Sequence, residues 1–251
     1  MKNFNKKTLI AVLAVVVILA VIAIAGKNSS MKSVANNFDL SLDKKSDEPL
    51  TDTTFALDTF ITVTIYHGGD ENVLKDSLDF IRKYEMVFSA TYPDAEPYKL
   101  NHRGNGVMSV KASEDLAYLI DKALYYSKVS NGAFDITTQP LKELWDFNTD
   151  DPKLPSDESI KEALPKVDYT RVSVEGDTIN FTSDDTQIDL GAIAKGYIAD
   201  KTKEFLKSKG VDSAIINLGG NVLCIGKKPD GQNFTIGLQK PYADRNETVA
   251  L

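Results

Sequence analysis

Residues 187–210, QIDLGAIAKGYIADKTKEFLKSKG, contain the residue types and spacing best suited to chemistry. A short run typical of a buried strand ends at Gly191, and a helical pattern follows as far as Gly210. The start of such a helix leaves backbone N–H groups unpaired, and these favour an anion. Lys195 lies in the first turn, where the helix dipole disfavours a cation unless an anion neutralises both. The pattern therefore indicates an anion site, in which Asp189 could hold Lys195, bind a ligand donor or help to bind a metal.

A second glycine turn, NLGGN at 217–221, follows one strand later, and Gly191 and Gly196 leave the helix start poor in side chains. Two such turns beside one helix N-terminus suggest backbone that approaches a phosphate. The alternative is an ordinary surface lysine at 195 and an aspartate that merely lies near a helix N-terminus. The chain has neither the GxxxxGK[ST] loop nor the GxGxxG dinucleotide fingerprint.

The elements that must position these residues follow from hydrophobic periodicity. Strands are predicted at 55–66, 107–111, 172–174, 178–182, 187–190, 214–217, 222–226 and 234–238. Helices are predicted at 72–88, from Ser113 to about Asn131, at 156–164 with Ser156 as its cap, and from Gly191 to Gly210. Residues 89–101 and 148–155 are polar and proline-containing, which indicates loops. This is an α+β layout, with helices packed on mostly antiparallel sheet.

The N-terminus differs from the rest of the chain. Lys2, Lys6 and Lys7 precede an unbroken apolar run from Leu9 to Ala25, so residues 1–25 are predicted to be a signal peptide or membrane anchor. Residues 26–50 are polar and indicate a tether. An extracytoplasmic location in a bacterium, anchored at the membrane or secreted, is therefore expected for the domain at 51–251.

Net charge and cysteine content exclude two further features, a nucleic-acid partner and an internal disulfide. The formal net charge is −7, and removing the three N-terminal lysines makes the body more acidic, so a nucleic-acid partner is not expected. Cys224 is the single cysteine, so no disulfide can form within the chain, and its strand-like surroundings predict a packed thiol.

Several motifs in the same order resemble the ApbE family of FAD:protein FMN transferases, over residues 55–241. These are SNGAFD at 130–135, QPL at 139–141 with LWDF at 144–147, DLGAIAKGY at 189–197, and NLGGN at 217–221. The resemblance implies an ApbE-like fold and transfer of FMN from FAD to a threonine of an acceptor protein, with magnesium required and AMP released. It also implies that the acceptor is a membrane redox subunit.

The resemblance also assigns site residues. Leu57, Thr91, Ala133, Phe134, Asp135, Asp189 and Lys195 would contact FAD, the lysine at the diphosphate, and the Ala192 carbonyl would be a magnesium ligand. Core packing is an equal alternative for Phe134. Asp58 stands where the family has glycine, and Thr91 stands where many members have a flavin-stacking tyrosine, for which Tyr92 could substitute.

The C-terminal end departs most from the family. Members continue with a histidine-containing I-D-P motif and a helix whose Asp and Thr complete the magnesium site, and neither follows Pro241 here. The sequence is therefore expected to be a truncated form with part of the domain missing, an exposed apolar edge at 234–238 and no transfer activity of its own. No catalytic residue is assigned. The alternatives to a transferase are an exported FAD-binding protein and an enzyme that hydrolyses FAD to FMN and AMP.

Overall fold

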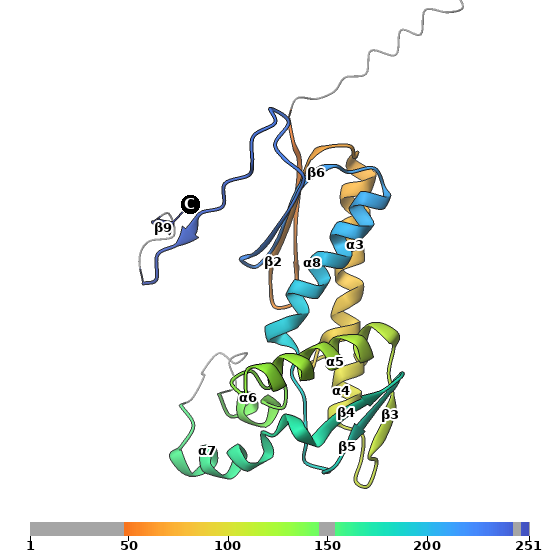
Figure 1. Cartoon of the computed structure of the whole chain (residues 1–251), viewed down its shortest axis with the longest axis vertical. Helices are drawn as coiled ribbons and strands as arrows, with labels where there is room; N and C mark the ends of the chain where they lie inside the picture. The colour runs from red at the N-terminus through yellow and green to blue at the C-terminus, as the bar shows by residue number, and fades with distance from the viewer. Residues whose placement is uncertain (1–47, 146–153, 243–246, 251) are drawn as a thin grey trace, which may run out of the picture. The chain divides into compact units, whose positions relative to one another are not determined.

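Figure 1 shows the computed structural model of the chain, which describes residues 48–145, 154–242 and 247–250. These residues fall within one compact unit that begins at Glu48. The predicted signal or anchor segment, nearly all of the predicted tether and most of the loop at 148–155 lie outside them. Within the described ranges, no helix has both the length and the apolar character needed to cross a membrane.

The strands are β1 (Leu50–Ala56), β2 (Thr59–His67), β3 (Ser109–Lys111), β4 (Val172–Glu175), β5 (Thr178–Phe181), β6 (Ser213–Leu218), β7 (Asn221–Ile225), β8 (Leu238–Gln239) and β9 (Thr248–Ala250). The helices are α3 (Glu71–Phe88), α4 (Glu96–Asn101), α5 (Glu114–Val129), α6 (Gln139–Trp145), α7 (Asp157–Ala163) and α8 (Gly191–Ser208).

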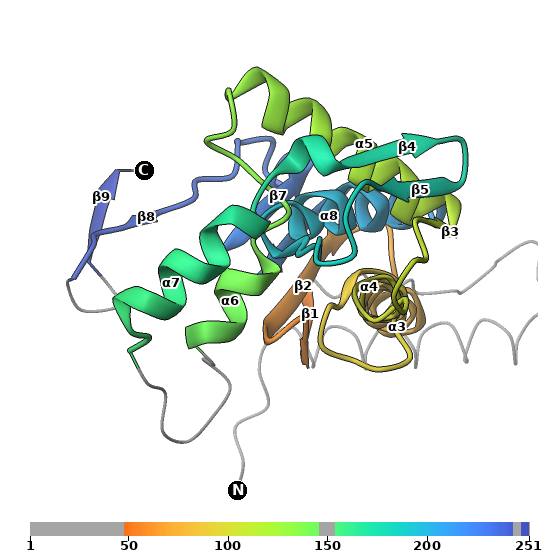
Figure 2. The same cartoon turned by 90° about the horizontal axis from the view of Figure 1, so that it is seen from below.

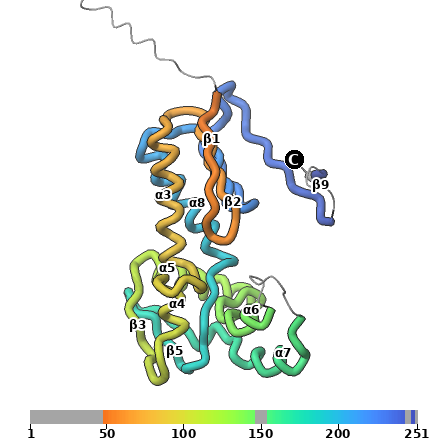
Figure 3. Tube along the Cα trace, turned by 180° about the vertical axis from the view of Figure 1, so that it is seen from behind, coloured from red at the N-terminus to blue at the C-terminus, as the bar shows by residue number. Residues whose placement is uncertain are grey.

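The largest sheet has four antiparallel strands in the order β1-β2-β6-β7. Helices α3 and α8 contact each other and lie along this sheet, α3 against β1 and β2 and α8 against β6 and β7 (Figures 1 and 3). Alternate β2 residues face the helices because successive strand side chains point to opposite faces. The buried cluster that results includes Ile61, Val63, Ile65, Leu78, Ile81, Ala194, Ile198, Ala214 and Ile216.

A smaller antiparallel sheet, in the order β3-β5-β4, completes the fold. Helix α5 contacts both β4 and α8. Figure 2 shows α8 with α5 on one side and strands of the larger sheet on the other. Helix α8 is therefore the central helix, and it begins at the stretch that the sequence analysis singled out.

The predicted α+β class, with mostly antiparallel sheet, is confirmed. The helices predicted at 72–88, from Ser113 and at 156–164 are present as α3, α5 and α7. Both serines cap their helices as predicted, Ser113 by accepting a hydrogen bond from the Leu116 N–H (3.3 Å) and Ser156 by accepting one from the Ser159 N–H (3.2 Å).

The single strand predicted at 55–66 is wrong, because the segment is a hairpin. Strand β1 ends at Ala56 and pairs with Thr59 of β2, so Leu57 and Asp58 form a two-residue turn. Alternation of apolar and polar residues continues through this turn, and neither residue is the glycine or asparagine that usually marks one. Ile61, Val63 and Ile65 of β2 share one face, and all three are buried.

The strand predicted at 187–190 is also wrong. The segment joins no sheet, and a side chain supplies its hydrogen bonds instead: Asn101 Oδ1 accepts from the Ile188 N–H (2.7 Å), and Asn101 Nδ2 donates to the Ile188 carbonyl (2.8 Å). Asn101 ends α4, which lies within the region predicted as a loop at 89–101.

The C-terminal prediction is correct only in part. Only Leu238 of the strand predicted at 234–238 enters β8, and β8 pairs with β9, which the sequence analysis did not predict. Ile236 and Leu238 are exposed, as expected for an apolar edge.

Candidate functional site

Three backbone anchors fix the segment that leads into α8. Two are the hydrogen bonds between the Asn101 side chain and the Ile188 backbone. In the third, the Asp189 N–H donates to the Ile136 carbonyl at 2.7 Å. Ile136 directly follows the SNGAFD motif, so this bond joins two of the recognised motifs. The anchors place the Asp189 side chain at the N-terminus of α8.

The Asp189 carboxylate uses both oxygens. Oδ1 accepts from the Gly191 N–H at 3.0 Å, and Oδ2 forms an ion pair with Lys142 Nζ of α6 at 2.7 Å. A Cβ at position 191 would lie 3.0 Å from Oδ1, so glycine is the residue that lets this carboxylate fold back over the helix end. Of the three roles left open for Asp189, the pairing with Lys195 is not formed, because the partner of Asp189 is Lys142.

The Leu57–Asp58 turn lies opposite this helix end. Leu57 has φ 55° and Asp58 has φ 56°, both in the left-handed region that non-glycine residues rarely adopt. Glu85 of α3 accepts a hydrogen bond from the Leu57 N–H through Oε1 at 2.9 Å. The helix thus holds the hairpin turn through a side chain.

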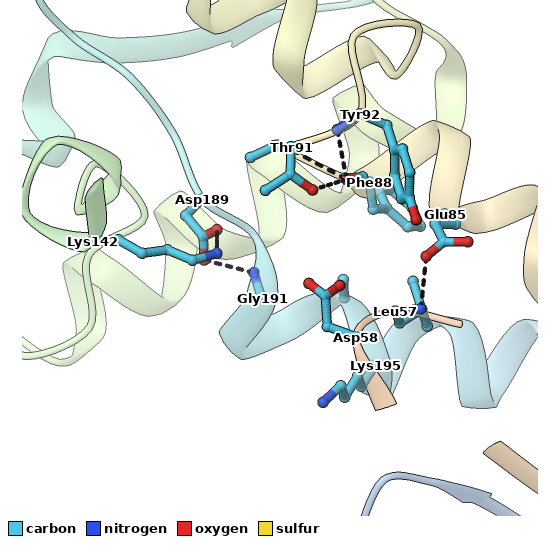
Figure 4. A pocket seen from close by; sticks show the side chains of 13 residues that line it. Leu57, Asp58, Glu85, Phe88, Thr91, Tyr92, Lys142, Asp189, Gly191 and Lys195 are labelled. Carbon is cyan, nitrogen blue, oxygen red and sulfur yellow. Dashed lines mark hydrogen bonds and ion pairs between the residues drawn. The ribbon is translucent and has the colours of Figure 1, made fainter. Parts of the chain in front are cut away.

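A cleft that is open to solvent lies between the turn, the end of α3 and the start of α8, and its cavity volume is about 70 Å³. Figure 4 shows that it is lined by side chains from separate segments of the chain. The lining residues are Leu57, Asp58, Glu85, Phe88, Ser89, Ala90, Thr91, Tyr92, Lys142, Asp189, Gly191, Ala194 and Lys195.

Four of the residues predicted to bind FAD meet in this cleft: Leu57, Thr91, Asp189 and Lys195. Tyr92, considered as a substitute for Thr91, lies beside it in the lining and is 46% exposed. Thr91 itself is held by Ser89, whose Oγ accepts from the Thr91 N–H at 3.1 Å.

The other four predicted residues are not in the cleft lining. Phe134 packs against the core, which was the alternative considered for it. Asp135 accepts from the Thr137 N–H (2.7 Å) and the Tyr169 N–H (3.0 Å), so both of its oxygens hold the chain. Ala133 and Ala192 are exposed, and Ala192 directly follows the cleft residue Gly191.

The cleft has a mixed charge. Lys195, partly exposed, forms no hydrogen bond or ion pair with any residue the structure describes, whereas Lys142 is paired with Asp189. The side chain of Asp58 is exposed, and Figure 4 shows its carboxylate directed into the space between Leu57 and Gly191. Lys195 is thus an unpaired cation in the first turn of α8, where the Asp189 carboxylate accepts from the Gly191 N–H, and an unpaired cation in a cleft suits an anionic ligand.

Aromatic side chains form the opposite wall. Phe88 lines the cleft, stacks on Tyr84 (ring centroids 5.5 Å apart) and meets Tyr197 edge-on (5.5 Å). Behind this wall, Asp115 of α5 accepts hydrogen bonds from the Tyr84 hydroxyl (3.1 Å) and the Tyr197 hydroxyl (2.6 Å). One carboxylate therefore ties α3, α5 and α8 together behind the cleft.

This cluster shifts the pKa of each of its members. Burial, and then the hydrogen bond to Asp115, raise the pKa of the Tyr84 and Tyr197 hydroxyls well above the ordinary value. Burial acts to raise the pKa of the Asp115 carboxyl, but the hydrogen bonds from the two tyrosines and the nearby Lys201 together lower it. The carboxylate and neutral phenols are thus the forms that the fold stabilises.

The described residues do not gather a metal site from side chains. No group of three His, Cys, Asp or Glu side chains within them could hold a metal ion. Magnesium is often bound by only one or two carboxylates together with substrate phosphates, and the carboxylates that line the cleft are those of Asp58, Glu85 and Asp189.

The sequence analysis missed Lys142 and Glu85. Lys142 lies between the QPL and LWDF motifs, and Glu85 falls on the inward stripe of α3. The only available signal was a charged residue on an otherwise apolar stripe at Glu85. The contact of Lys142 with Asp189 spans 47 positions and has no local signal.

Comparisons with known proteins identify relatives of this chain. The FAD:protein FMN transferase of Treponema pallidum (strain Nichols) is 32% identical over 162 residues, 62% of this chain and 44% of that protein. The FAD:protein FMN transferase of Klebsiella pneumoniae (strain 342) is 32% identical over 185 residues, 73% of this chain and 56% of that protein. The chain spans about half the length of these curated relatives.

Solved structures share the fold. The ApbE protein of Thermotoga maritima has a TM-score of 0.72 and 28% identity, over 80% of this chain and 66% of that chain. The flavin transferase ApbE of Vibrio cholerae has a TM-score of 0.73 over 81% of this chain and 67% of that chain, and at 22% identity it shows the fold alone. A model of the ApbE family matches residues 57–251. The chain therefore belongs to the ApbE family.

Proposed function

We propose that this protein transfers FMN from FAD to a threonine hydroxyl of an acceptor protein and releases AMP. The observation that carries the proposal is the cleft itself, in which Leu57, Thr91 and the pair Asp189 and Lys195 meet from three separate segments. Membership of the ApbE family and the relatives named FAD:protein FMN transferase support it.

The two walls of the cleft suit the two parts of FAD. The aromatic and apolar side offers stacking surface for the flavin ring through Tyr92 and Leu57, with the buried Phe88 behind them. The side that carries Lys195 and the N-terminus of α8 offers a cation and a positive dipole end to the diphosphate. Because Asp189 is paired with Lys142, its charge is offset beside this anion.

The transfer step is an in-line displacement at phosphorus. The threonine oxygen attacks the phosphorus on the FMN side, the bond from that phosphorus to the oxygen bridging to AMP breaks, and the hydroxyl proton passes to solvent. Positioning and charge neutralisation supply most of the rate in such reactions. Lys195 would offset charge on the diphosphate, and Tyr92 would fix the flavin.

Magnesium is part of the proposal. It would neutralise phosphate charge, and it would be held by the Asp58 carboxylate in the cleft lining and by the Ala192 carbonyl next to Gly191. Ala133, Phe134 and Asp135, which join the α8 entry through Ile136 and Asp189, remain proposed FAD contacts.

Location and partner are proposed from the sequence. The apolar run from Leu9 to Ala25 after three lysines supports an extracytoplasmic, membrane-associated or secreted protein in a bacterium. A membrane redox subunit that carries the modified threonine is the acceptor that fits this location. Protease added to intact cells should therefore reach the body of the protein, and a protected body would contradict the proposal.

The experiment combines binding with transfer. The full chain is titrated with FAD by flavin fluorescence, then incubated with FAD, magnesium and solubilised bacterial membrane proteins, and flavin is read in a denaturing gel beside released AMP. A fluorescent acceptor band supports transfer, AMP without a band indicates hydrolysis, and FAD binding alone indicates a binding protein. Absence of FAD binding would contradict all three.

Lys195 is tested by substitution. Lys195→Ala should weaken FAD binding by roughly tenfold or more, because it removes a charge-assisted contact to the diphosphate. The control is Lys203→Ala, which removes the same charge from the same helix but outside the cleft lining. Equal effects of the two variants would place Lys195 outside the site.

A further inference from the structure

The Leu57–Asp58 turn adopts a conformation that its sequence does not favour. Both residues have positive φ, as a two-residue type I′ hairpin turn requires, and such turns are normally built from asparagine, aspartate and glycine. Leucine in this region is an outlier, and such residues persist only where the surroundings determine them. Something outside the hairpin must therefore hold this turn.

Two contacts hold the turn and its flank. Next to it, the Gly219 N–H donates to the Phe60 carbonyl at 3.1 Å, which fixes the first residues of β2 against the neighbouring hairpin. At the turn itself, Glu85 Oε1 accepts from the Leu57 N–H at 2.9 Å, across 28 positions of sequence. The second contact is the only hydrogen bond from outside the hairpin to Leu57 or Asp58 among the described residues.

The turn forms one side of the cleft. Leu57, Asp58 and Glu85 all line it, and Figure 4 shows Glu85 reaching across to the Leu57 backbone from α3. If the turn relaxed to a conformation with negative φ, the Leu57 side chain and the Asp58 carboxylate would both leave their places in the cleft. The shape of the FAD site thus depends on a conformation that Glu85 supports.

Glu85 is poorly suited to bind a phosphate directly, because its carboxylate and a diphosphate repel each other. We propose that Glu85 is a positioning residue: it holds the Leu57–Asp58 turn in its left-handed conformation and thereby sets the affinity for flavin. The identity of the ligand, FAD, rests on the proposed function. The hydrogen bond by which Glu85 holds the turn does not depend on any ligand.

The first test needs no ligand. Hydrogen exchange of the Leu57 amide is measured by NMR in the full chain, in Glu85→Ala and in the control Lys83→Ala, which changes an exposed residue on the same helix. Protection of the Leu57 amide should be lost in Glu85→Ala alone. Unchanged protection in that variant would overturn the proposal.

The second test measures FAD binding. Glu85→Ala should weaken binding by roughly tenfold, because it removes the oxygen that accepts from the Leu57 N–H and so frees the turn. Glu85→Gln keeps an acceptor oxygen and should retain most of the affinity, which a role through charge would not allow. Lys83→Ala should bind FAD as the wild type does.

Asp58→Gly separates positioning from direct contact. Glycine favours the turn by itself, so the loss caused by Glu85→Ala should be less than half as large in the Asp58→Gly background as in the wild type. An undiminished loss would show that Glu85 acts on the ligand directly and would overturn the proposal. The proposal would also be overturned if the wild type bound FAD and Glu85→Ala bound it equally well. If the wild type did not bind FAD at all, both the proposed function and the claim about affinity would be wrong.

Discussion

Lys142 and Asp189 form an ion pair of 2.7 Å at the cleft, although 47 positions separate them in the sequence. The Asp189 side chain is only 16% exposed, so water screens the pair less than a surface salt bridge. The pair holds Asp189 over the start of α8 and lowers the negative charge beside the proposed diphosphate position.

Replacing Lys142 should therefore weaken FAD binding. Lys142→Met keeps the aliphatic stem but removes the charge, which leaves Asp189 to repel the diphosphate. We expect affinity to fall roughly fivefold at low salt, with a smaller effect at 0.5 M salt because of screening. Fluorescence titrations at the two salt concentrations test this.

The matched control for Lys142 is Lys161→Met, which removes the same charge from an exposed position on α7. If both variants lose affinity equally, the effect reflects net charge, and the ion pair has no specific role in binding.

The sequence predicted those elements whose signals are local. Helix α5 has a serine cap, an acidic first turn and an apolar stripe, and α8 has a buried stripe from Ala194 to Leu206, so periodicity alone located both. The motif residues Asp189 and Lys195 could also be assigned to a site, because a helix N-terminus has the same electrostatic character in any fold.

The features that the sequence did not predict depend on contacts between distant segments. Nothing local in 55–66 reveals the turn at Leu57, because its conformation is held by Glu85 on another element. Similarly, 187–190 has the composition of a strand, but its hydrogen-bond partner is the Asn101 side chain and not a neighbouring strand. Tertiary contacts override local propensity in both cases.

Asn101 should be important for stability and for the site. Asn101→Ala leaves the N–H and the carbonyl of Ile188 without their partners in a buried segment. We expect a loss of about 2–4 kcal/mol in the free energy of unfolding. Urea unfolding measures it, with Asn72→Ala at an exposed position of α3 as the control. A loss no larger than that of the control would contradict the bridging role.

Asp115 should make stability depend on pH. Its folded-state pKa lies below the unfolded value of about 3.9, so its contribution is present above that pH and is lost as the pH falls through the folded pKa. Asp115→Asn should reduce stability by about 1 kcal/mol at pH 7, a figure kept small because the carboxylate is partly exposed. Urea unfolding between pH 3 and 8 should show the difference from wild type shrinking below pH 4. A difference that stays constant over this range would contradict it.

The tyrosines of the same cluster should make the free energy of unfolding depend on pH in the alkaline range. The pKa of Tyr84 and Tyr197 is raised in the folded state, so their contribution is present below the unfolded value of about 10 and is lost as the pH rises further. Tyr197→Phe should therefore show a smaller loss of stability between pH 9 and 11 than the wild type, measured by unfolding in urea. Equal losses would mean that the hydroxyl is not coupled to folding.

The two glycines of the β6–β7 turn should respond differently to alanine. Both have positive φ, 61° at Gly219 and 94° at Gly220, so alanine is strained at either position. At Gly219 the new Cβ would also overlap Thr59 Oγ1 and lie 2.7 Å from its Cγ2, whereas at Gly220 it would meet nothing within 4 Å. Gly220→Ala should cost about 1 kcal/mol of unfolding free energy, and Gly219→Ala roughly 2–4 kcal/mol, because strain and overlap add there.

The change at Gly219 that lowers stability should also alter the cleft. Thr59 directly follows Asp58, so a displaced Thr59 moves the turn that Glu85 holds. Gly219→Ala should therefore weaken FAD binding at temperatures where it is still folded, and Gly220→Ala should not. Circular dichroism fixes the folded range of each variant before the fluorescence titration. Equal costs for the two variants would mean that Thr59 moves aside freely, and the neighbouring hairpin would then have no part in shaping the cleft.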